Sequence, residues 1–323
     1  MIHDQILLND WHPVASLAEL QQKEMLSVQL IGEDLVVWRS GEQIQAWQDL
    51  CVHRGTRLSL GKIKEGNLLE CPYHGWTYNS AGRCVRIPAH PEQTPPRKAQ
   101  VKVYRACERY GLVWVSLGKP DNDFVSFPEW ELPAFRKILC GPYPIQASGP
   151  RIIENFLDVA HFPFVHQGIL GVREHPEISN YEAEILENGV EARDVRVYQP
   201  DPYGTGQGDH VTYTYRVLRP LTAYLVKEST GPKFSILLTI TPHDETHSTA
   251  WMWLASNTGH EIPESEVIAY QDRIFAQDRP IVESQRPELL PLDLQAELHL
   301  RSDRTAIAYR RWLSELGLTY GTS

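Results

Sequence analysis

The chain has 323 residues, a formal net charge of -10 and five cysteines. This length predicts two domains with sizeable cores, and the acidic balance argues against a nucleic-acid-binding protein, because phosphate binding needs clustered Lys and Arg. The N-terminal segment MIHDQILLND lacks the basic residues of a signal peptide, and no apolar run approaches the roughly 18 residues that span a bilayer, so we expect a cytoplasmic protein without a membrane segment. An odd number of cysteines favours free or metal-bound thiols over a disulfide framework.

The first part of the chain has a strand pattern. Residues 25–117 form short alternating segments, such as SVQLIGEDLVVWRS and YGLVWVSLG, with turn residues between them. This pattern predicts an antiparallel β domain. Residues 118–135 are rich in Pro and acidic residues and predict a linker. We therefore expect a boundary near residue 140, with domains at 1–140 and 141–323.

The second part combines helical and strand-like patterns. The expected elements are a short helix around Asn155, strands at 181–199, 210–218 and 234–242, a helix from Glu264 to Gln285, and a last helix at 303–316 with Ser302 as its N-cap. This mixture predicts an α+β domain. The glycine-rich segment GTGQGD has no βαβ pattern around it, so we expect a loop there and no nucleotide site.

Two short Cys and His pairs stand out in the β domain. They are C-x-H at Cys51 and His53 and C-x-x-H at Cys71 and His74, and a glycine follows each pair closely. The glycines predict tight turns, so we expect each pair at the tip of a hairpin and all four side chains at one metal site. Tetrahedral zinc suits this donor set. So does a Rieske [2Fe-2S] cluster, in which two Cys hold one iron and two His hold the other.

The residues around these pairs favour the cluster. The segments CVHRGTRLSLG and CPYHGWTYNSAGRC resemble the Rieske signature over their whole length, including Pro72, Trp76 and Gly82. Rieske proteins of respiratory complexes carry an additional cysteine in each loop, and Thr56 and Tyr73 stand at those positions here. The sequence therefore resembles the oxygenase branch of the Rieske proteins.

A second candidate site lies in the segment ENFLDVAHFPFVH, which carries Asn155, Asp158, His161 and His166. Two His and one carboxylate form the facial triad that binds non-heme Fe(II) and leaves coordination positions open. Residues five apart on an unbroken helix are separated by about 140°, so the two histidines need a break, which we attribute to Pro163. Asp158 precedes His161 by one turn, and we expect it to accept a hydrogen bond from the ring.

The third iron ligand is expected on the helix at 264–285. Its apolar stripe at helical spacing consists of Val267, Gln271, Ile274, Phe275, Ile281 and Val282, and Asp278 falls in the middle. A carboxylate there costs several kcal/mol unless it is paired or binds a metal. We therefore predict Asp278 as the ligand and Asp272 as a solvated bystander, although pairing of Asp278 with a buried Arg is an alternative. Ile274 and Phe275 are candidate substrate-pocket residues, with ordinary core packing as the alternative.

Over nearly its whole length the chain resembles the catalytic α subunit of the Rieske non-heme iron oxygenases. The similar types are vanillate O-demethylases, methylxanthine N-demethylases and saxitoxin-pathway hydroxylases, the last on the segments WRSGEQIQAWQDLCVHRG, RIPAHPE, HFPFVHQGILG and YRRWLSELGLTYG. The resemblance implies an antiparallel β Rieske domain followed by a helix-grip (START-like) catalytic domain. It also implies a head-to-tail homotrimer in which His74 of one subunit faces Asp158 of the next, with Asp158 and Asn155 acting in catalysis.

The resemblance further implies the reaction. The expected enzyme is a monooxygenase that uses O2 and electrons from NAD(P)H to hydroxylate a C–H bond of a small polycyclic substrate, such as an alkaloid. The alternatives are oxidative N- or O-demethylation of an aromatic substrate, an aromatic-ring dioxygenase with a β subunit, and a Rieske electron carrier without oxygenase activity. The sequence contains no ferredoxin cysteine run and no nicotinamide or flavin domain, so we expect a separate reductase, with flavin and a plant-type ferredoxin domain.

Overall fold

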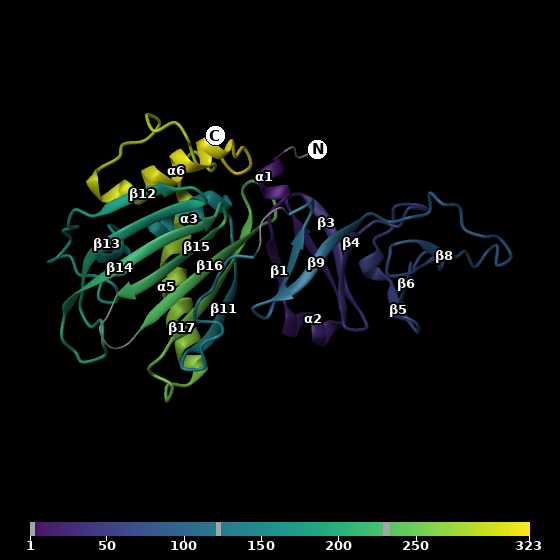
Figure 1. Ribbon diagram of the computed structural model, residues 1–323, viewed down its shortest axis with the longest axis horizontal. Helices are drawn as coiled ribbons and strands as arrows, with labels where there is room; N and C mark the ends of the chain where they lie inside the picture. The colour runs from purple at the N-terminus through teal and green to yellow at the C-terminus, as the bar shows by residue number, and fades with distance from the viewer. Residues whose placement is uncertain (1–3, 121–123, 229–232) are drawn as a thin grey trace. The chain divides into compact units, whose positions relative to one another are not determined.

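The computed structural model describes residues 4–120, 124–228 and 233–323. The chain forms two compact units, Met1–Asp123 and Phe124–Ser323, whose helices and strands are drawn in Figure 1. Residue 140, the expected domain boundary, lies inside the strand β11 (Arg136–Ile145). Residues 121–123 of the expected linker lie outside the described residues.

The first unit contains two antiparallel sheets. A six-stranded sheet has the order β1-β10-β9-β4-β3-β2, and a four-stranded sheet has the order β5-β6-β7-β8. Trp38 of β3 and Trp47 of β4 are fully buried, and their rings meet edge to face at 5.0 Å. Cys51 and Cys71 belong to the same buried cluster. The apolar core therefore anchors the loops that carry the Cys and His pairs.

The elements of the first unit, in chain order, are α1 (Gln5–Leu8), β1 (His12–Ser16), α2 (Leu17–Lys23), β2 (Met25–Leu30), β3 (Glu33–Ser40), β4 (Gln43–Gln48), the 3-10 turn η1 (Leu58–Leu60), β5 (Lys62–Lys64), β6 (Leu68–Glu70), β7 (Thr77–Tyr78), β8 (Cys84–Arg86), β9 (Val103–Arg109) and β10 (Leu112–Ser116). The antiparallel β domain expected from the sequence is confirmed.

The second unit is a seven-stranded antiparallel sheet with the order β11-β17-β16-β15-β14-β13-β12. The long helix α5 (Glu264–Ser284) runs across one face of the sheet (Figure 1). There Gln271 of α5 reaches the sulfur of Met252 on β17 at 3.3 Å. On the other face Trp130 packs edge to face on Trp253, the next residue of the strand. Because neighbouring residues of a strand point to opposite faces, both faces of the sheet are covered.

The remaining elements of the second unit are α3 (Gly149–Leu157), α4 (Phe162–Val165), β12 (Glu182–Leu186), β13 (Gly189–Gln199), β14 (Asp209–Arg219), β15 (Thr222–Glu228), β16 (Phe234–Pro242), β17 (Ser248–Ser256), the 3-10 turn η2 (Arg301–Asp303) and α6 (Arg304–Leu316). A helix laid on an antiparallel sheet confirms the expected α+β class. The expected N-cap of α6 was wrong: Asp303 occupies that position, and the Ser302 hydroxyl donates to the Asp303 side chain at 2.9 Å.

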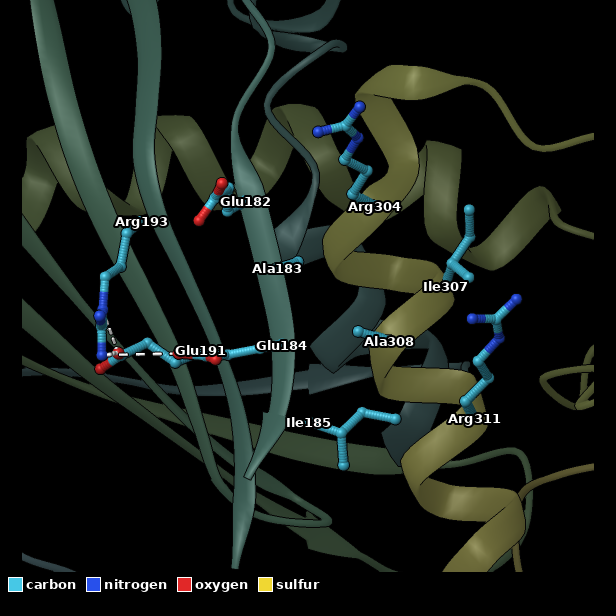
Figure 2. A pocket seen from close by; sticks show the side chains of 10 residues that line it. All are labelled: Glu182, Ala183, Glu184, Ile185, Glu191, Arg193, Arg304, Ile307, Ala308 and Arg311. Atoms are coloured by element: carbon cyan, nitrogen blue, oxygen red, sulfur yellow. Dashed lines mark hydrogen bonds and ion pairs between the residues drawn. The ribbon is translucent and has the colours of Figure 1, made fainter. Parts of the chain in front are cut away.

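An open groove of 680 Å³ lies between the edge strand β12 and α6 (Figure 2). Arg193 of β13 extends beside Glu191 and pairs with it, while Arg304 and Arg311 project from α6. The described residues that line this groove include none of the predicted metal ligands, so the groove is separate from both candidate metal sites. No helix among the described residues is long and apolar enough to cross a lipid bilayer.

Candidate metal centres

The two Cys and His pairs sit in loops with the same backbone pattern. In the first loop, the Gly55 N–H donates to the Cys51 carbonyl at 2.9 Å. In the second, the Gly75 N–H donates to the Cys71 carbonyl at 3.1 Å. Both glycines have a left-handed φ, +71° and +69°, which L side chains rarely adopt. The repeated turn explains why a glycine follows each pair.

The hairpin expectation holds for one pair only. Cys71 and His74 form the tip between β6 and β7, which pair directly with each other. Cys51 and His53 instead lie in the loop that joins β4 to η1, so the expected hairpin was wrong for this pair. The turn geometry is thus shared by the two loops while the flanking strands differ. A short glycine motif determines the conformation of the turn but not the secondary structure on either side of it.

The donor groups in these loops fit a Rieske cluster. Cys51 and Cys71 are each 2% exposed, and burial raises the pKa of the Cys71 thiol, an effect that a bound metal would offset by stabilising the thiolate. The rings of His53 and His74 lie 4.6 Å apart. The His53 Nδ1 atom is buried without a hydrogen-bond partner among the described residues, which is the arrangement a metal ligand requires.

The second candidate site begins at a break between two helices. α3 ends at Leu157, Asp158 is extended (φ -85°, ψ 132°), and α4 begins at Phe162. The break therefore precedes Pro163, which sits in the first turn of α4, where a missing N–H is tolerated. Our attribution of the break to Pro163 was wrong. Asp158 faces His161 across the break rather than along one helix.

His161 and His166 are the N-cap and C-cap residues of α4, so this one-turn helix, and not the break before it, sets their separation. Nε2 of His161 and Nε2 of His166 lie 3.2 Å apart. Oδ1 of Asp278, on α5, lies 3.4 Å from the first and 3.0 Å from the second. One ligand atom from each of the three side chains lies within 4.8 Å of the others. The structure thus places the three predicted ligands around one point.

The two histidine rings carry their N–H protons on Nδ1, the nitrogen that points away from the shared metal position. His161 Nδ1 lies 3.1 Å from Oδ2 of Asp158, and His166 Nδ1 lies 2.9 Å from Oε1 of Gln277. Both contacts put an acceptor at Nδ1, which places the proton there and leaves each Nε2 with a lone pair. Oδ1 of Asp278 has no hydrogen-bond donor among the described residues. Three lone pairs that converge without a proton fit a bound cation, and the set of two His and one carboxylate fits Fe(II).

Burial and charge act in opposite directions on His166. Burial alone would lower the pKa of its ring, but the nearby Asp278 carboxylate and the contact with Gln277 raise it. At the other centre, burial lowers the pKa of His53, and electrostatic repulsion from His74 and Arg54 lowers it further. The pKa shifts of these two ligand rings therefore have opposite directions.

The other predicted residues have varied surroundings. Asp272 is exposed as expected, and it accepts a hydrogen bond from Tyr143 at 2.7 Å. Phe275 is buried and stacks on the same Tyr143 at 4.2 Å, and Ile274 is 9% exposed, so their role as pocket residues stays a prediction. Ile281 was wrongly placed on the buried stripe, since it is 46% exposed.

Some residues at the two centres were not predicted from the sequence. Gln277 contacts His166, and its only sequence signal is its place next to Asp278. Trp76 is predicted only as part of the Rieske signature, and in the structure its indole stacks parallel to the His53 ring at 4.5 Å.

Asn155 is predicted to act in catalysis beside Asp158. In the structure its backbone carbonyl accepts a hydrogen bond from the Asp158 N–H at 3.2 Å.

Comparisons with known proteins match both parts of the chain. Residues 10–105 match the Rieske [2Fe-2S] domain, and residues 145–319 match the vanillate O-demethylase oxygenase C-terminal domain. The chain is 32% identical to methylxanthine N1-demethylase NdmA of Pseudomonas putida, over 97% of this chain and 92% of that protein. It is 38% identical to oxidoreductase NdmD of the same species, over 37% of this chain and 20% of that protein.

A solved structure shares the fold over almost the whole chain. The structure of Pseudomonas putida NdmA with caffeine has a TM-score of 0.85 and 30% sequence identity with this chain. The likeness covers 96% of this chain and 91% of that one. Both units described above are therefore part of the shared fold.

Proposed function

The chain belongs to the Rieske oxygenases whose catalytic domain is of the vanillate O-demethylase type, and from this premise we propose that it is a monooxygenase. The [2Fe-2S] cluster is bound by Cys51, His53, Cys71 and His74, and the mononuclear iron by His161, His166 and Asp278. The reaction consumes one O2, two electrons and two protons, and it yields one C–OH group and one water.

The convergence of His161, His166 and Asp278 carries this proposal. A Rieske protein that only carries electrons needs no second metal site, whereas these side chains present three lone pairs to one point. A ferrous ion bound there would bind and reductively activate O2 with electrons from the cluster. Asp158 and Gln277 hold the Nδ1 protons of the two ligand rings. The electron-carrier alternative gives these contacts no role.

The assembly and the electron source follow from the family. We propose a head-to-tail homotrimer in which His74 of one subunit faces Asp158 of the next, so that Asp158 bridges a cluster and a neighbouring iron. A separate NAD(P)H-dependent reductase supplies the electrons, because the two matched domains account for cluster and iron only. The similarity to oxidoreductase NdmD supports a partner of that kind. The cytoplasmic location expected from the sequence stays a prediction.

The substrate is proposed to be a small polycyclic compound, and the relatives favour an N-methylated heteroaromatic one. NdmA is named a methylxanthine N1-demethylase, and a structure of it contains caffeine. Hydroxylation of an N-methyl carbon gives an N–CH2OH group, which releases formaldehyde and leaves N–H. Hydroxylation of a carbon that is not bound to N or O leaves a stable alcohol. The same C–H oxidation therefore yields demethylation when the oxidised carbon is a methyl group bound to N or O. It yields a stable hydroxylated product when that carbon is bound only to other carbons.

Product analysis tests the proposal. The purified protein, a surrogate ferredoxin reductase and NADH are incubated under 18O2 with caffeine, theobromine and alkaloids that lack methyl groups on N or O. We expect one 18O atom in a hydroxylated product, or formaldehyde in an amount equal to the demethylated product. His161→Ala should abolish both. If the reduced cluster of His161→Ala reoxidises in O2 and substrate as fast as that of the wild type, the electron-carrier alternative holds instead.

A further inference from the structure

Two consecutive residues of α5 contact opposite ends of one buried imidazole. Oε1 of Gln277 lies 2.9 Å from His166 Nδ1, and Oδ1 of Asp278 lies 3.0 Å from His166 Nε2. The His166 side chain is 2% exposed. Consecutive residues of a helix diverge by about 100°, so they reach the ring from two sides. A single helix therefore determines how this ring is oriented.

The contact with Gln277 also determines where the ring carries its proton. A neutral imidazole has one N–H, and the nitrogen without it is the one that binds a metal. Because Oε1 only accepts, the proton lies on Nδ1 and Nε2 is free. If the amide presented its NH2 group instead, Nδ1 would have to accept and the proton would occupy Nε2. That proton would lie between His166, His161 and Asp278, where the metal belongs.

We infer that Gln277 is a positioning residue: it holds His166 in the tautomer that binds iron and so sets the iron affinity of the site. This role of Gln277 rests on the proposed function in one respect, the identity of the metal as iron. It does not depend on which substrate the enzyme oxidises. The positioning role explains why a polar side chain, Gln277, stands next to Asp278. Without an acceptor at Nδ1, the buried ring would pay for an unpaired N–H or adopt the other tautomer.

The two ligand rings are supported unequally. The acceptor for His161 is the carboxylate of Asp158, whereas the acceptor for His166 is a neutral amide. A carboxylate raises the basicity of the ring that donates to it, while an amide orients the ring without adding charge. We therefore expect Gln277→Glu to support His166 at least as well as the wild-type side chain does. A side chain of similar size without an acceptor will not.

The test compares Gln277→Leu and Gln277→Glu with the wild type. Gln271→Leu is the matched control, since Gln271 is a buried glutamine of the same helix that contacts Met252 instead. The mononuclear iron is removed with a chelator, the oxidised cluster is kept, and Co²⁺ is titrated by visible absorption. We expect Gln277→Leu to weaken Co²⁺ binding about 10- to 100-fold and Gln277→Glu to bind as tightly as the wild type or tighter. The control should bind like the wild type.

Proton NMR of the Co²⁺ form provides a readout that simple loss of packing would not change. The wild type should show two exchangeable, metal-shifted Nδ1–H signals, one from each ligand ring. One signal should broaden through faster exchange with water in Gln277→Leu, and both should remain in Gln277→Glu. Circular dichroism and the cluster absorbance verify that each variant is folded.

Two results would overturn the inference. In one, Gln277→Leu binds Co²⁺ like the wild type and keeps both signals. In the other, Gln277→Glu is as weak as Gln277→Leu, which would show that an acceptor at position 277 does not account for the iron affinity. These measurements need no substrate and no reductase. A wild-type protein that binds Co²⁺ as expected but forms no oxygenated product would contradict the proposed function alone.

Discussion

Nδ1 of His161 lies 3.1 Å from Oδ2 of Asp158 across the turn that separates α3 from α4. The other carboxylate oxygen, Oδ1, accepts a hydrogen bond from the Ala160 N–H at 2.7 Å. One carboxylate therefore both shapes the turn and orients a metal-ligand ring. The backbone break before α4 and the proton on the outer side of His161 therefore depend on the same residue.

Asp158→Ala should lower iron affinity about 10- to 100-fold, because the ring loses the acceptor that holds its proton. Asp158→Asn should lose less, since its amide oxygen still accepts one hydrogen bond. The measurement is mononuclear iron content after dialysis against a weak chelator, with the cluster absorbance as the internal control. Equal iron content in Asp158→Ala and the wild type would show that this contact does not support the site.

The choice of carboxylate on α5 is tested by a matched pair of variants. Asp278→Asn replaces a proposed ligand and should remove the mononuclear iron while the cluster spectrum remains. Asp272→Asn changes an exposed residue whose contact is the Tyr143 hydroxyl, so it should leave iron content and turnover unchanged. Metal analysis of both purified variants gives the answer. The assignment fails if Asp272→Asn loses the iron and Asp278→Asn keeps it.

A buried ion-pair cluster supports α3 next to this site. Arg310 of α6 lies 2.6 and 2.8 Å from the two carboxylate oxygens of Glu154 and 2.5 Å from Glu297, and its side chain is 2% exposed. Arg310→Met removes the closest partner of Glu154 and leaves Glu297 with Arg151, and breaking a buried pair typically costs about 3–5 kcal/mol. We expect a loss of this size in urea unfolding followed by far-UV circular dichroism. A loss below about 1 kcal/mol, the level of an exposed pair, would contradict the buried geometry.

The same cluster predicts a pH dependence. Burial alone would raise the pKa of Glu297, but hydrogen bonds from Arg151 and Arg310 outweigh it and lower the pKa. A carboxyl with a lowered folded-state pKa stabilises the protein above its unfolded pKa of about 4.3 and loses this effect as the pH falls through the folded-state value. The difference in unfolding free energy between wild type and Glu297→Gln should thus be largest near neutral pH. A difference that grows below pH 4 would have the wrong sign.

Two cysteines outside the proposed cluster should resist thiol reagents. Burial is the main cause that raises the pKa of Cys107 to about 11 and of Cys140 to about 12. At pH 8 about one in a thousand Cys107 thiols and about one in ten thousand Cys140 thiols would be the reactive thiolate. Iodoacetamide labelling followed by peptide mass spectrometry should find both unmodified in the native protein. Both should be modified in guanidinium chloride.

The sequence was informative where a site is encoded by neighbouring residues. The cluster residues lie in two short motifs, and each glycine turn is a local requirement. Asp278 could be predicted because a carboxylate within an apolar stripe needs a partner wherever the helix packs. Both predictions rest on energies that depend little on the rest of the fold.

The sequence was uninformative where a contact depends on tertiary structure. Gln277 meets His166 only because the sheet holds α5 against the turn after α3, which no local pattern describes. The sequence predicts a helix break at Pro163 because a proline disfavours helix before it, yet the proline fits the first turn of α4. Ile281 follows the helical spacing of the stripe, but it is 46% exposed. Helical periodicity predicts which side chains share a face of α5, but it does not predict how far along the helix that face is buried.

The central claim is that one chain carries a [2Fe-2S] cluster and a separate iron held by two imidazoles and a carboxylate. Iron and acid-labile sulfide are measured in anaerobically reconstituted wild type and in His161→Ala. The account predicts about three iron and two sulfide per wild-type chain, and about two of each in the variant with an unchanged cluster spectrum. A wild type with two iron per chain, or a variant that keeps three, would contradict it.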